Sequence, residues 1–127
     1  MGLLSDFFVA SAQDIPGLDL RTTEAPFPIV QGSGIDPIML AELDFLVTGD
    51  RQREPELVRD DGEAWFYRLD AALVRALANL SDKQIGQTAD EWIGDIDGTA
   101  TEFVGRLCAL AQTAVDRGHE LYVHIGL

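Results

Sequence analysis

Basic residues are scarce in this chain of 127 residues. It carries 9 lysines and arginines against 22 aspartates and glutamates, which gives a formal net charge of −13, and Lys83 is its one lysine. Phosphate backbones and anionic membrane surfaces repel such a protein, so we expect neither nucleic acid nor membrane as a partner. The charge either keeps a small protein soluble or presents an acidic surface to a basic protein partner.

Cysteine is equally scarce. The single Cys108 excludes an internal disulfide and any metal site built from several cysteines. It lies in EFVGRLCALAQTAV, where apolar residues recur at helical spacing, so we expect a buried and unreactive thiol. A nucleophilic role would need a neighbouring base, and His119 and His124 are the two histidines of the chain.

Long apolar runs are also absent. No run approaches the roughly 20 residues that a membrane-spanning helix needs. The opening LLSDFFVASA resembles a signal peptide, but no lysine or arginine precedes Arg21, and Ser5 and Asp6 interrupt the apolar run. Gly2 invites myristoylation, yet that motif needs serine or threonine where Asp6 stands. We therefore expect a cytoplasmic protein.

Strands are predicted at both ends of one domain, residues 1–127. Residues 3–11 favour a buried strand, and Asp61 and Gly62 separate two short strand-like runs in the manner of a hairpin. The proline- and glycine-rich residues 22–33 predict a loop, with a short extended piece at residues 27–30. The alternation in ELYVHIGL predicts a last strand with one apolar face, made of Leu121, Val123, Ile125 and Leu127.

Four helices are predicted between these strands. Asp36 and a following proline start the first, whose wide apolar stripe indicates burial on more than one side. Asp70 caps the second, and residues 81–84 form a capping box for the third. Thr99 and Glu102 form another capping box for a long fourth helix. The order of elements predicts an α+β domain, with a mixed or antiparallel sheet of about four strands and four helices packed mainly on one face.

The segment WIGDIDGTATEF contains the Asp-x-Asp-Gly-Thr pattern of haloacid dehalogenase phosphatases. In that chemistry Asp95 is a nucleophile at the end of a buried strand, and Asp97 is an acid beside Mg²⁺. The residues around Asp95 have helical spacing instead, with Ile93 and Ile96 on the apolar side, and no acidic pair follows. We therefore exclude a phosphatase and predict a turn between two helices at Asp97 and Gly98, with Thr99 as cap.

A calcium-binding loop is a second reading of this segment. Acidic or hydroxyl residues fall at alternate positions from 95 to 101. The sixth position of such a loop needs glycine and is Ala100, and the twelfth needs glutamate and is Arg106. We therefore expect no metal site here, and no segment of the chain suggests a cofactor.

The last strand carries a polar row on its second face. Glu120, Tyr122 and His124 share that face because side chains alternate along a strand. A carboxylate, a phenol and an imidazole in one row form either an acid–base site, a ligand contact, or a sheet face covered by a loop or a second subunit. His119 and His124 point to opposite faces, so they do not form a metal pair.

AWFYRL carries aromatic residues on both faces. Trp65 and Tyr67 share one face, while Phe66 and Arg68 share the other. This pattern predicts either a central strand covered on both sides or an exposed aromatic patch. In a central strand, Arg68 would pair with an acid and could hold an anion. The candidate ligand or interface residues are therefore Trp65, Arg68, Glu120, Tyr122 and His124, and no catalytic residue is assigned.

Three segments, MGLLSDFFVA, AWFYRLDAALVRAL and GHELYVHIGL, resemble small bacterial proteins of the YfbM-like family. The resemblance implies a stand-alone cytosolic domain of uncharacterised function, with no catalytic motif.

From these observations we expect a non-enzymatic, acidic protein-interaction module, similar to an immunity protein or antitoxin. It would bind a protein partner or associate with itself as a homodimer. The alternative is a small enzyme or small-molecule-binding domain that uses Tyr122, His124 and Arg68 around the loop at residues 22–34.

Overall fold

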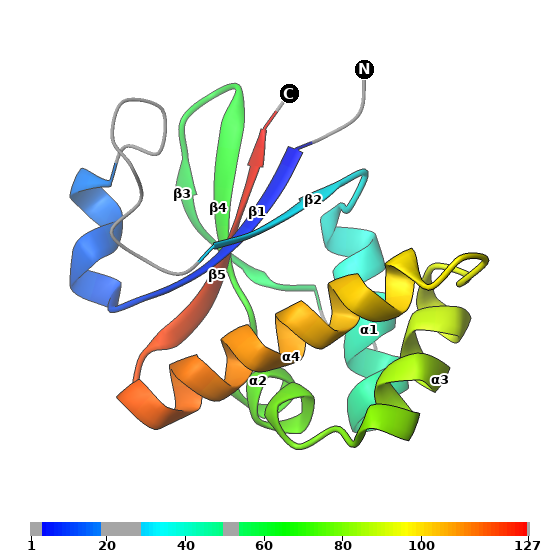
Figure 1. The fold of residues 1–127 in the computed structure, drawn as a ribbon. Coiled ribbons are helices and arrows are strands. Elements are labelled where there is room, and N and C mark those ends of the chain that lie inside the picture. The colour runs from blue at the N-terminus through cyan, green and yellow to red at the C-terminus, as the bar shows by residue number, and fades with distance from the viewer. Residues whose placement is uncertain (1–3, 19–28, 50–53, 127) are drawn as a thin grey trace.

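The computed structural model describes residues 4–18, 29–49 and 54–126. The chain has an α+β fold whose helices and strands are arranged as in Figure 1. In chain order the elements are β1 (Leu4–Ala10), the 3₁₀ helix η1 (Ala12–Gly17), β2 (Ile29–Ser33), α1 (Pro37–Thr48), β3 (Glu56–Asp60), β4 (Ala64–Arg68), α2 (Ala71–Ala78), α3 (Asp82–Trp92), α4 (Thr99–Arg117) and β5 (Glu120–Gly126).

The strands form one sheet in the order β2-β1-β5-β4-β3, and each neighbouring pair is antiparallel. β5 therefore lies at the centre of the sheet, between β1 and the hairpin of β3 and β4. Val123 of β5 faces Phe7 of β1 on one side and Tyr67 of β4 on the other. The sheet has five strands where the sequence predicted about four.

The additional strand is β2, which falls in the segment predicted as a loop. Glycine weakens an isolated strand, so Gly32 favoured a loop in the sequence. In the fold, that glycine permits close packing, because a Cβ atom at Gly32 would lie 3.1 Å from the ring of Phe103 on α4. Packing of β2 against α4 thus outweighs the local preference of its residues. The remaining part of the predicted loop, residues 22–28, lies outside the described residues.

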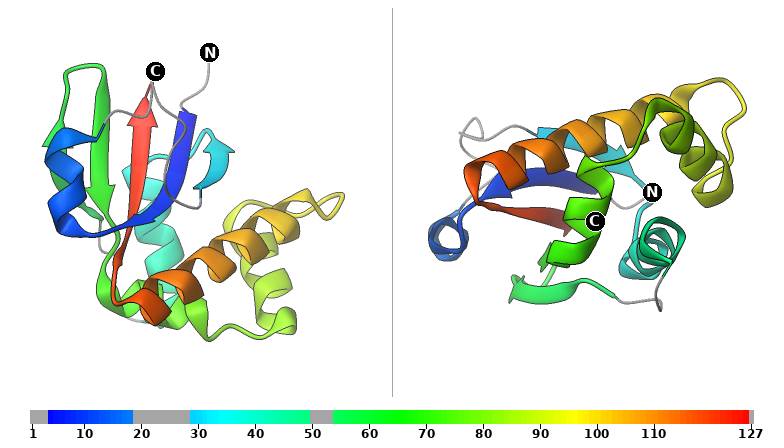
Figure 2. Two further views of the ribbon diagram at one scale, coloured as in Figure 1. Left: turned by 60° about the vertical axis from the view of Figure 1, so that its left-hand side comes forward. Right: turned by 90° about the horizontal axis from the view of Figure 1, so that it is seen from below.

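The main hydrophobic core lies between the sheet and α1–α4, which Figures 1 and 2 show on one side of the sheet, with η1 on the other. β1 contributes Phe7 and Val9 to this core. Leu121, Val123 and Ile125 of β5 belong to it as well, and each is 2% exposed or less. The predicted apolar face of the last strand is therefore confirmed as core.

Helix α1 begins and ends where its sequence predicts. The Asp36 carboxylate accepts the N–H of Met39 at 2.8 Å, and Gly49 ends the helix with φ of +71°. The prediction that α1 is buried on more than one side is confirmed in part, because α1 packs against both α2 and α3, but its apolar stripe is wider than its buried surface. Ile38 and Phe45 are 64% and 48% exposed, because α1 lies at the outside of the helical layer with one side turned to solvent.

The capping groups of α2 and α3 also agree with the sequence. The Asp70 carboxylate accepts the N–H of Ala72 at 2.9 Å at the start of α2. In the capping box of α3, Ser81 Oγ accepts the N–H of Gln84 at 3.2 Å, and the Gln84 side chain accepts the N–H of Ser81 at 2.9 Å.

Candidate functional site

The sheet face opposite α1–α4, called the outer face below, carries a second and smaller apolar cluster. Phe8, Phe66 and Tyr122 stand on three neighbouring strands, and each is 2% exposed or less. The ring of Phe8 stacks on Tyr122 at 5.6 Å between centroids and meets Phe66 edge-on at 6.1 Å. Ile15 of η1 belongs to the same cluster. β4 is therefore an internal strand covered on both faces, which decides between the two readings of AWFYRL.

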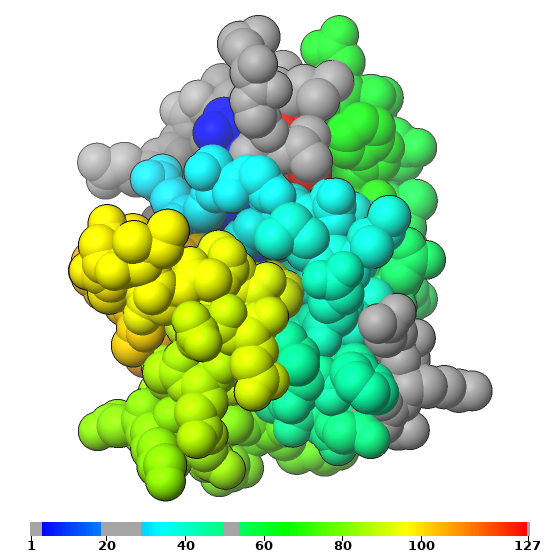
Figure 3. Space-filling view, turned by 90° about the vertical axis from the view of Figure 1, so that its right-hand side faces the viewer, coloured from blue at the N-terminus to red at the C-terminus, as the bar shows by residue number. Residues whose placement is uncertain are grey.

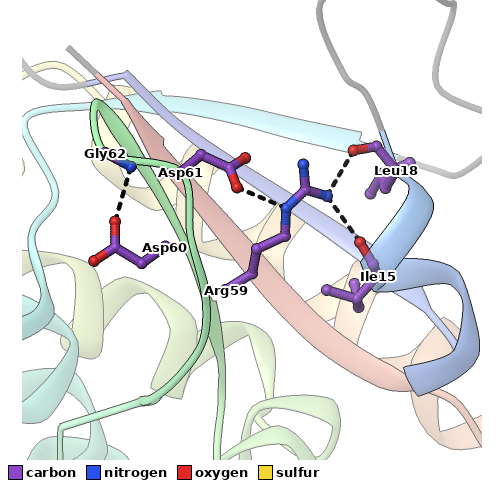
Figure 4. Close-up of polar contacts among 6 residues, drawn as sticks. All are labelled: Ile15, Leu18, Arg59, Asp60, Asp61 and Gly62. Atoms are coloured by element: carbon purple, nitrogen blue, oxygen red, sulfur yellow. Dashed lines mark hydrogen bonds and ion pairs between the residues drawn. The ribbon is translucent and has the colours of Figure 1, made fainter.

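Arg59 of β3 fixes η1 over the outer face, as Figure 4 shows. Its Nη1 donates to the carbonyl oxygens of Ile15 and Leu18 at 2.8 and 2.7 Å. Its Nε donates to Asp61 at 2.9 Å, and its guanidinium carbon lies 4.7 Å from the ring centroid of Phe66. The same side chain thus satisfies the carbonyl groups at the end of η1 and covers an aromatic ring.

Three candidate residues form one hydrogen-bonded network at the end of the outer face. The Tyr122 hydroxyl donates to Glu120 at 2.7 Å, and Arg68 Nη1 donates to the other oxygen of Glu120 at 3.3 Å. Arg68 Nη2 pairs in addition with Glu56. Burial, and then the hydrogen bond and charge of Glu120, raise the pKa of Tyr122 above its usual value. The phenol is therefore a hydrogen-bond donor at neutral pH and not a base.

His124 lies further along the same face and forms a separate pair. It stands opposite Asp6 of β1 in the strand register, with 4.0 Å between its Nδ1 and the Asp6 Oδ2. Its ring lies 4.7 Å from the ring of Phe66. Burial raises the pKa of Asp6, and the charge of His124 offsets part of that shift.

Trp65 is the candidate residue that lies apart from the others. It packs against the main core on the helix side of β4, on the face opposite to Arg68. The structure therefore brings Arg68, Glu120 and Tyr122 together, places His124 beside a different partner, and separates Trp65 from the outer face.

A groove of about 580 Å³, called the Arg68 groove below, lies between the sheet and the ends of α2 and α4. Its ionisable lining residues are Glu54, Glu56, Arg68, Asp70, Arg75, His119 and Glu120. These groups can hydrogen-bond a polar molecule, but the described part of the lining contains no serine, threonine or cysteine to act as a nucleophile. Within residues 4–18, 29–49 and 54–126, no three His, Cys, Asp or Glu side chains are placed to hold a metal ion.

Cys108 lies inside α4 and faces the main core. It is 2% exposed, as its sequence context predicted, and burial raises the pKa of its thiol to about 11. The reactive thiolate is therefore scarce at neutral pH, which leaves Cys108 without the activation that a nucleophile needs.

The DIDG segment connects α3 to α4, so the predicted turn is confirmed. The Asp97 carboxylate accepts the N–H of Thr99 at 3.0 Å, and Asp95 accepts the N–H of Gly98 at 2.9 Å. The predicted capping box of Thr99 and Glu102 is wrong, because Thr99 is already the first helical residue and Gly98 is the N-cap. The two preceding aspartates supply the acceptors instead.

A second groove, of about 510 Å³, lies between β2, the start of α1 and the α3–α4 loop. Figure 3 faces these three segments, which adjoin one another on that surface. We call it the isoleucine groove, because Ile93 and Ile96 line it and are 43% and 100% exposed. Ile35, Met39, Ala100 and Phe103 supply the rest of its apolar lining.

This groove was missed in the sequence. The sequence grouped Ile93 and Ile96 with apolar residues at helical spacing, while predicting that the helix ends near Ile93. In the structure α3 ends at Trp92 and Ile96 lies exposed in the loop. A signal was present in the two glycines that enclose the second isoleucine. Gly94 and Gly98 both adopt positive φ, +85° and +87°, which takes the loop out of helical geometry on either side of Ile96.

Comparison with protein-family models, with curated proteins and with solved structures finds no match to this chain. The resemblance of three segments to YfbM-like proteins therefore stays a prediction. Over the described part of the chain, no helix has the length and apolar character to cross a membrane.

Proposed function

We propose that this protein is a non-enzymatic, acidic protein-interaction module, similar in role to an immunity protein or antitoxin. The observation that carries the proposal is the isoleucine groove, where Ile96 is 100% exposed and Ile93 43% exposed on a chain with a formal net charge of −13. A contiguous apolar surface at a groove is typical of a binding site. The acidic charge would select a basic partner and speed the encounter with it.

The arrangement of the polar candidates supports the same proposal. Arg68 already has two carboxylate partners, and Tyr122 is 1% exposed. The imidazole of His124 packs against Phe66. Arg68 and Tyr122 both line a pocket of about 440 Å³ next to η1, but His124 is not among its lining residues, so the three side chains do not meet in that pocket.

The alternative proposal is a small enzyme or small-molecule-binding domain that uses Tyr122, His124 and Arg68. Its support is the Arg68 groove, whose volume of about 580 Å³ suits a small polar ligand. Tyr122 and His124 are not among the residues that line this groove, so two of its three proposed residues would not touch the ligand.

Affinity capture followed by reconstitution tests the leading proposal. The tagged protein is expressed in its host and captured from the lysate in buffer with about 0.05 M NaCl. Co-purifying proteins are identified, and each is then purified and titrated against the protein by calorimetry. We expect a basic partner with a Kd of about 1 µM or below. Raising NaCl to about 0.5 M should weaken binding by about tenfold or more, because the attraction is between opposite charges. A retained small metabolite, with no protein that binds on reconstitution, would favour the Arg68 groove instead.

A further inference from the structure

We propose that the isoleucine groove receives an extended basic segment of a protein partner, in which apolar side chains alternate with lysine or arginine. This inference rests on the proposed function and specifies where the partner binds and with what chemistry. The groove, its exposed isoleucines and the charge around them support this inference.

The α3–α4 loop holds Ile96 outward. Hydrogen bonds from the N–H groups of Gly98 and Thr99 to Asp95 and Asp97 fix the loop beyond the isoleucine, at 2.9 and 3.0 Å. Asp95 also accepts the hydroxyl of Thr101, in the first turn of α4. The side chain is therefore presented by an ordered loop, and it loses little conformational freedom when a partner covers it.

The opposite wall of the groove is the edge strand β2. Gln31, Gly32 and Ser33 line the groove, and within the described part of the chain β1 is the one strand paired with β2. An extended partner segment can therefore run alongside β2, with alternate side chains directed at Ile35, Met39 and Phe103.

Acidic residues outnumber basic ones in the segments that form the groove, where Arg106 of α4 pairs with Glu102. Among the residues that the structure describes, the lining contains Asp97 and no lysine or arginine. Residues 81–105 carry a single basic residue, Lys83, and six acidic ones, namely Asp82, Asp90, Glu91, Asp95, Asp97 and Glu102. Hydrogen bonds from Thr99, from its side chain and then its backbone, lower the pKa of Asp97, so this carboxylate stays ionised well below neutral pH.

This charge selects among the possible occupants. A second copy of the chain would bring another formal charge of −13 against the same acidic residues, and nucleic acid would bring phosphates. A neutral apolar molecule would leave the carboxylate of Asp97, which lines the groove, without a charged partner in the ligand. A segment with both apolar and basic side chains is complementary to both features of the groove.

Three labelled synthetic peptides test this chemistry by fluorescence anisotropy at about 0.05 M NaCl. Leucine alternates with lysine in the first and with glutamate in the second, while glycine alternates with lysine in the third. We expect the leucine–lysine peptide to bind about tenfold or more tightly than either of the others. In amide NMR spectra it should shift residues 31–33 and 93–100. Equal binding of the leucine–lysine and glycine–lysine peptides, or shifts centred elsewhere, would overturn the proposal.

Matched variants separate the groove from general charge attraction. Ile96→Ser should weaken leucine–lysine binding by about fivefold or more, because its apolar contact is lost. Leu57→Ser removes another exposed apolar side chain, 48% exposed on the opposite edge strand β3, and should change binding by less than about twofold. Asp97→Asn keeps a capping oxygen but removes the charge, so it should weaken binding by about threefold.

The same variants distinguish this inference from the proposed function. If a partner captured from the host binds Ile96→Ser as tightly as the parent protein, the groove assignment is wrong while the interaction module stands. If sedimentation shows a dimer that Ile96→Ser dissociates, the groove belongs to a second copy and the basic segment is excluded. If the captured partner binds the parent protein and its affinity for Ile96→Ser is lower by about fivefold or more, both proposals are supported.

Discussion

Arg59 donates a hydrogen bond of 2.8 Å to the carbonyl oxygen of Ile15, a residue 44 positions earlier in the chain. This contact joins β3, at one edge of the sheet, to the 3₁₀ helix that covers the outer face. One side chain from a distant strand thus helps to hold η1, together with the packing of Ile15 in the apolar cluster of the outer face.

Replacing Arg59 should therefore destabilise the protein more than replacing an arginine at the surface. Arg59→Ala removes the donor to the carbonyl of Leu18 and one of the two donors to the carbonyl of Ile15, which keeps the N–H of Leu18, at a cost of about 1–3 kcal/mol in the free energy of unfolding. The control is Arg106→Ala, which removes an exposed pair with Glu102 on α4 and should cost about 0.5 kcal/mol or less. Urea denaturation measures both, and equal losses would show that Arg59 does not hold η1.

Removing the central strand should abolish folding. Leu121, Val123 and Ile125 each contribute about 1.5–3 kcal/mol through burial, against a net stability of about 5–15 kcal/mol for a domain of this kind. Deleting residues 121–127 also leaves the facing backbone groups of β1 and β4 unpaired. We expect an insoluble or unfolded product in circular dichroism. His124→Ala should still melt cooperatively, and a truncated protein that melts near the parent temperature would contradict this fold.

Substitutions at the start of α4 can distinguish the observed cap, in which Asp95 accepts the N–H of Gly98, from the capping box of Thr99 and Glu102 that the sequence predicted. Asp95→Ala removes the acceptor of the Gly98 N–H and should cost about 0.5–2 kcal/mol. Glu102→Ala should cost about 0.5 kcal/mol or less, because Glu102 forms only an exposed pair with Arg106. Thermal melts of the two variants give the comparison. A larger loss for Glu102→Ala would restore the capping box.

Asp6 gives the stability of the protein a pH dependence. Since burial raises its pKa, the folded state binds a proton at Asp6 more tightly than the unfolded state does, and stability falls as the pH rises through the raised pKa. Asp6→Asn should therefore stabilise the protein at pH 7. The gain should vanish below the usual pKa of 3.8, where both states are protonated.

His124 provides the internal control for this prediction. Its charge offsets part of the shift at Asp6, so Asp6→Asn should stabilise a His124→Ala protein more than it stabilises the parent. Urea denaturation of the four proteins between about pH 3 and pH 7 measures the coupling. A gain from Asp6→Asn that is independent of pH would exclude the buried carboxylate as its cause.

Cys108 should react with a thiol reagent only when the protein unfolds. Its thiol is 2% exposed and its pKa is raised to about 11, so access and the thiolate fraction are both low. With one cysteine in the chain, the release of thionitrobenzoate from Ellman's reagent reports this site alone. We expect the reaction at pH 8 to be slow in buffer and fast in urea. Rapid reaction of the folded protein would place the thiol at the surface.

Elements with a strong local pattern were predicted well from the sequence. The bounds of α1 follow from Asp36, Pro37 and Gly49, whose preferences act within a few residues. The face of β5 that enters the core follows from strict alternation, because side chains of a strand point to opposite faces in turn.

Features that depend on distant contacts were missed. β2 forms because Gly32 lets it approach Phe103, which stands 71 positions later, and no local pattern reports that fit. The role of Arg59 depends in the same way on η1. The exposure of Ile96 was missed because helical spacing continues across Gly94 in the sequence, while the chain itself leaves the helix there. Three of the five candidate residues lie together because β4 pairs with β5. Trp65 lies apart from them because side chains alternate between the two faces of β4, which directs Trp65 toward the main core.

The central position of β5 also delays formation of the sheet during synthesis, because β5 is made after the strands on either side of it. About 110 positions separate the end of β1 from the start of β5, although the two strands are direct neighbours. At roughly 5–20 residues per second, a ribosome takes about 5–20 s to supply β5 after β1 has been made. During that interval Phe7, Phe8 and Val9 have no strand to cover them on the β5 side. We therefore expect the apolar residues of β1 to be exposed in the nascent chain until β5 has been made and the sheet can close.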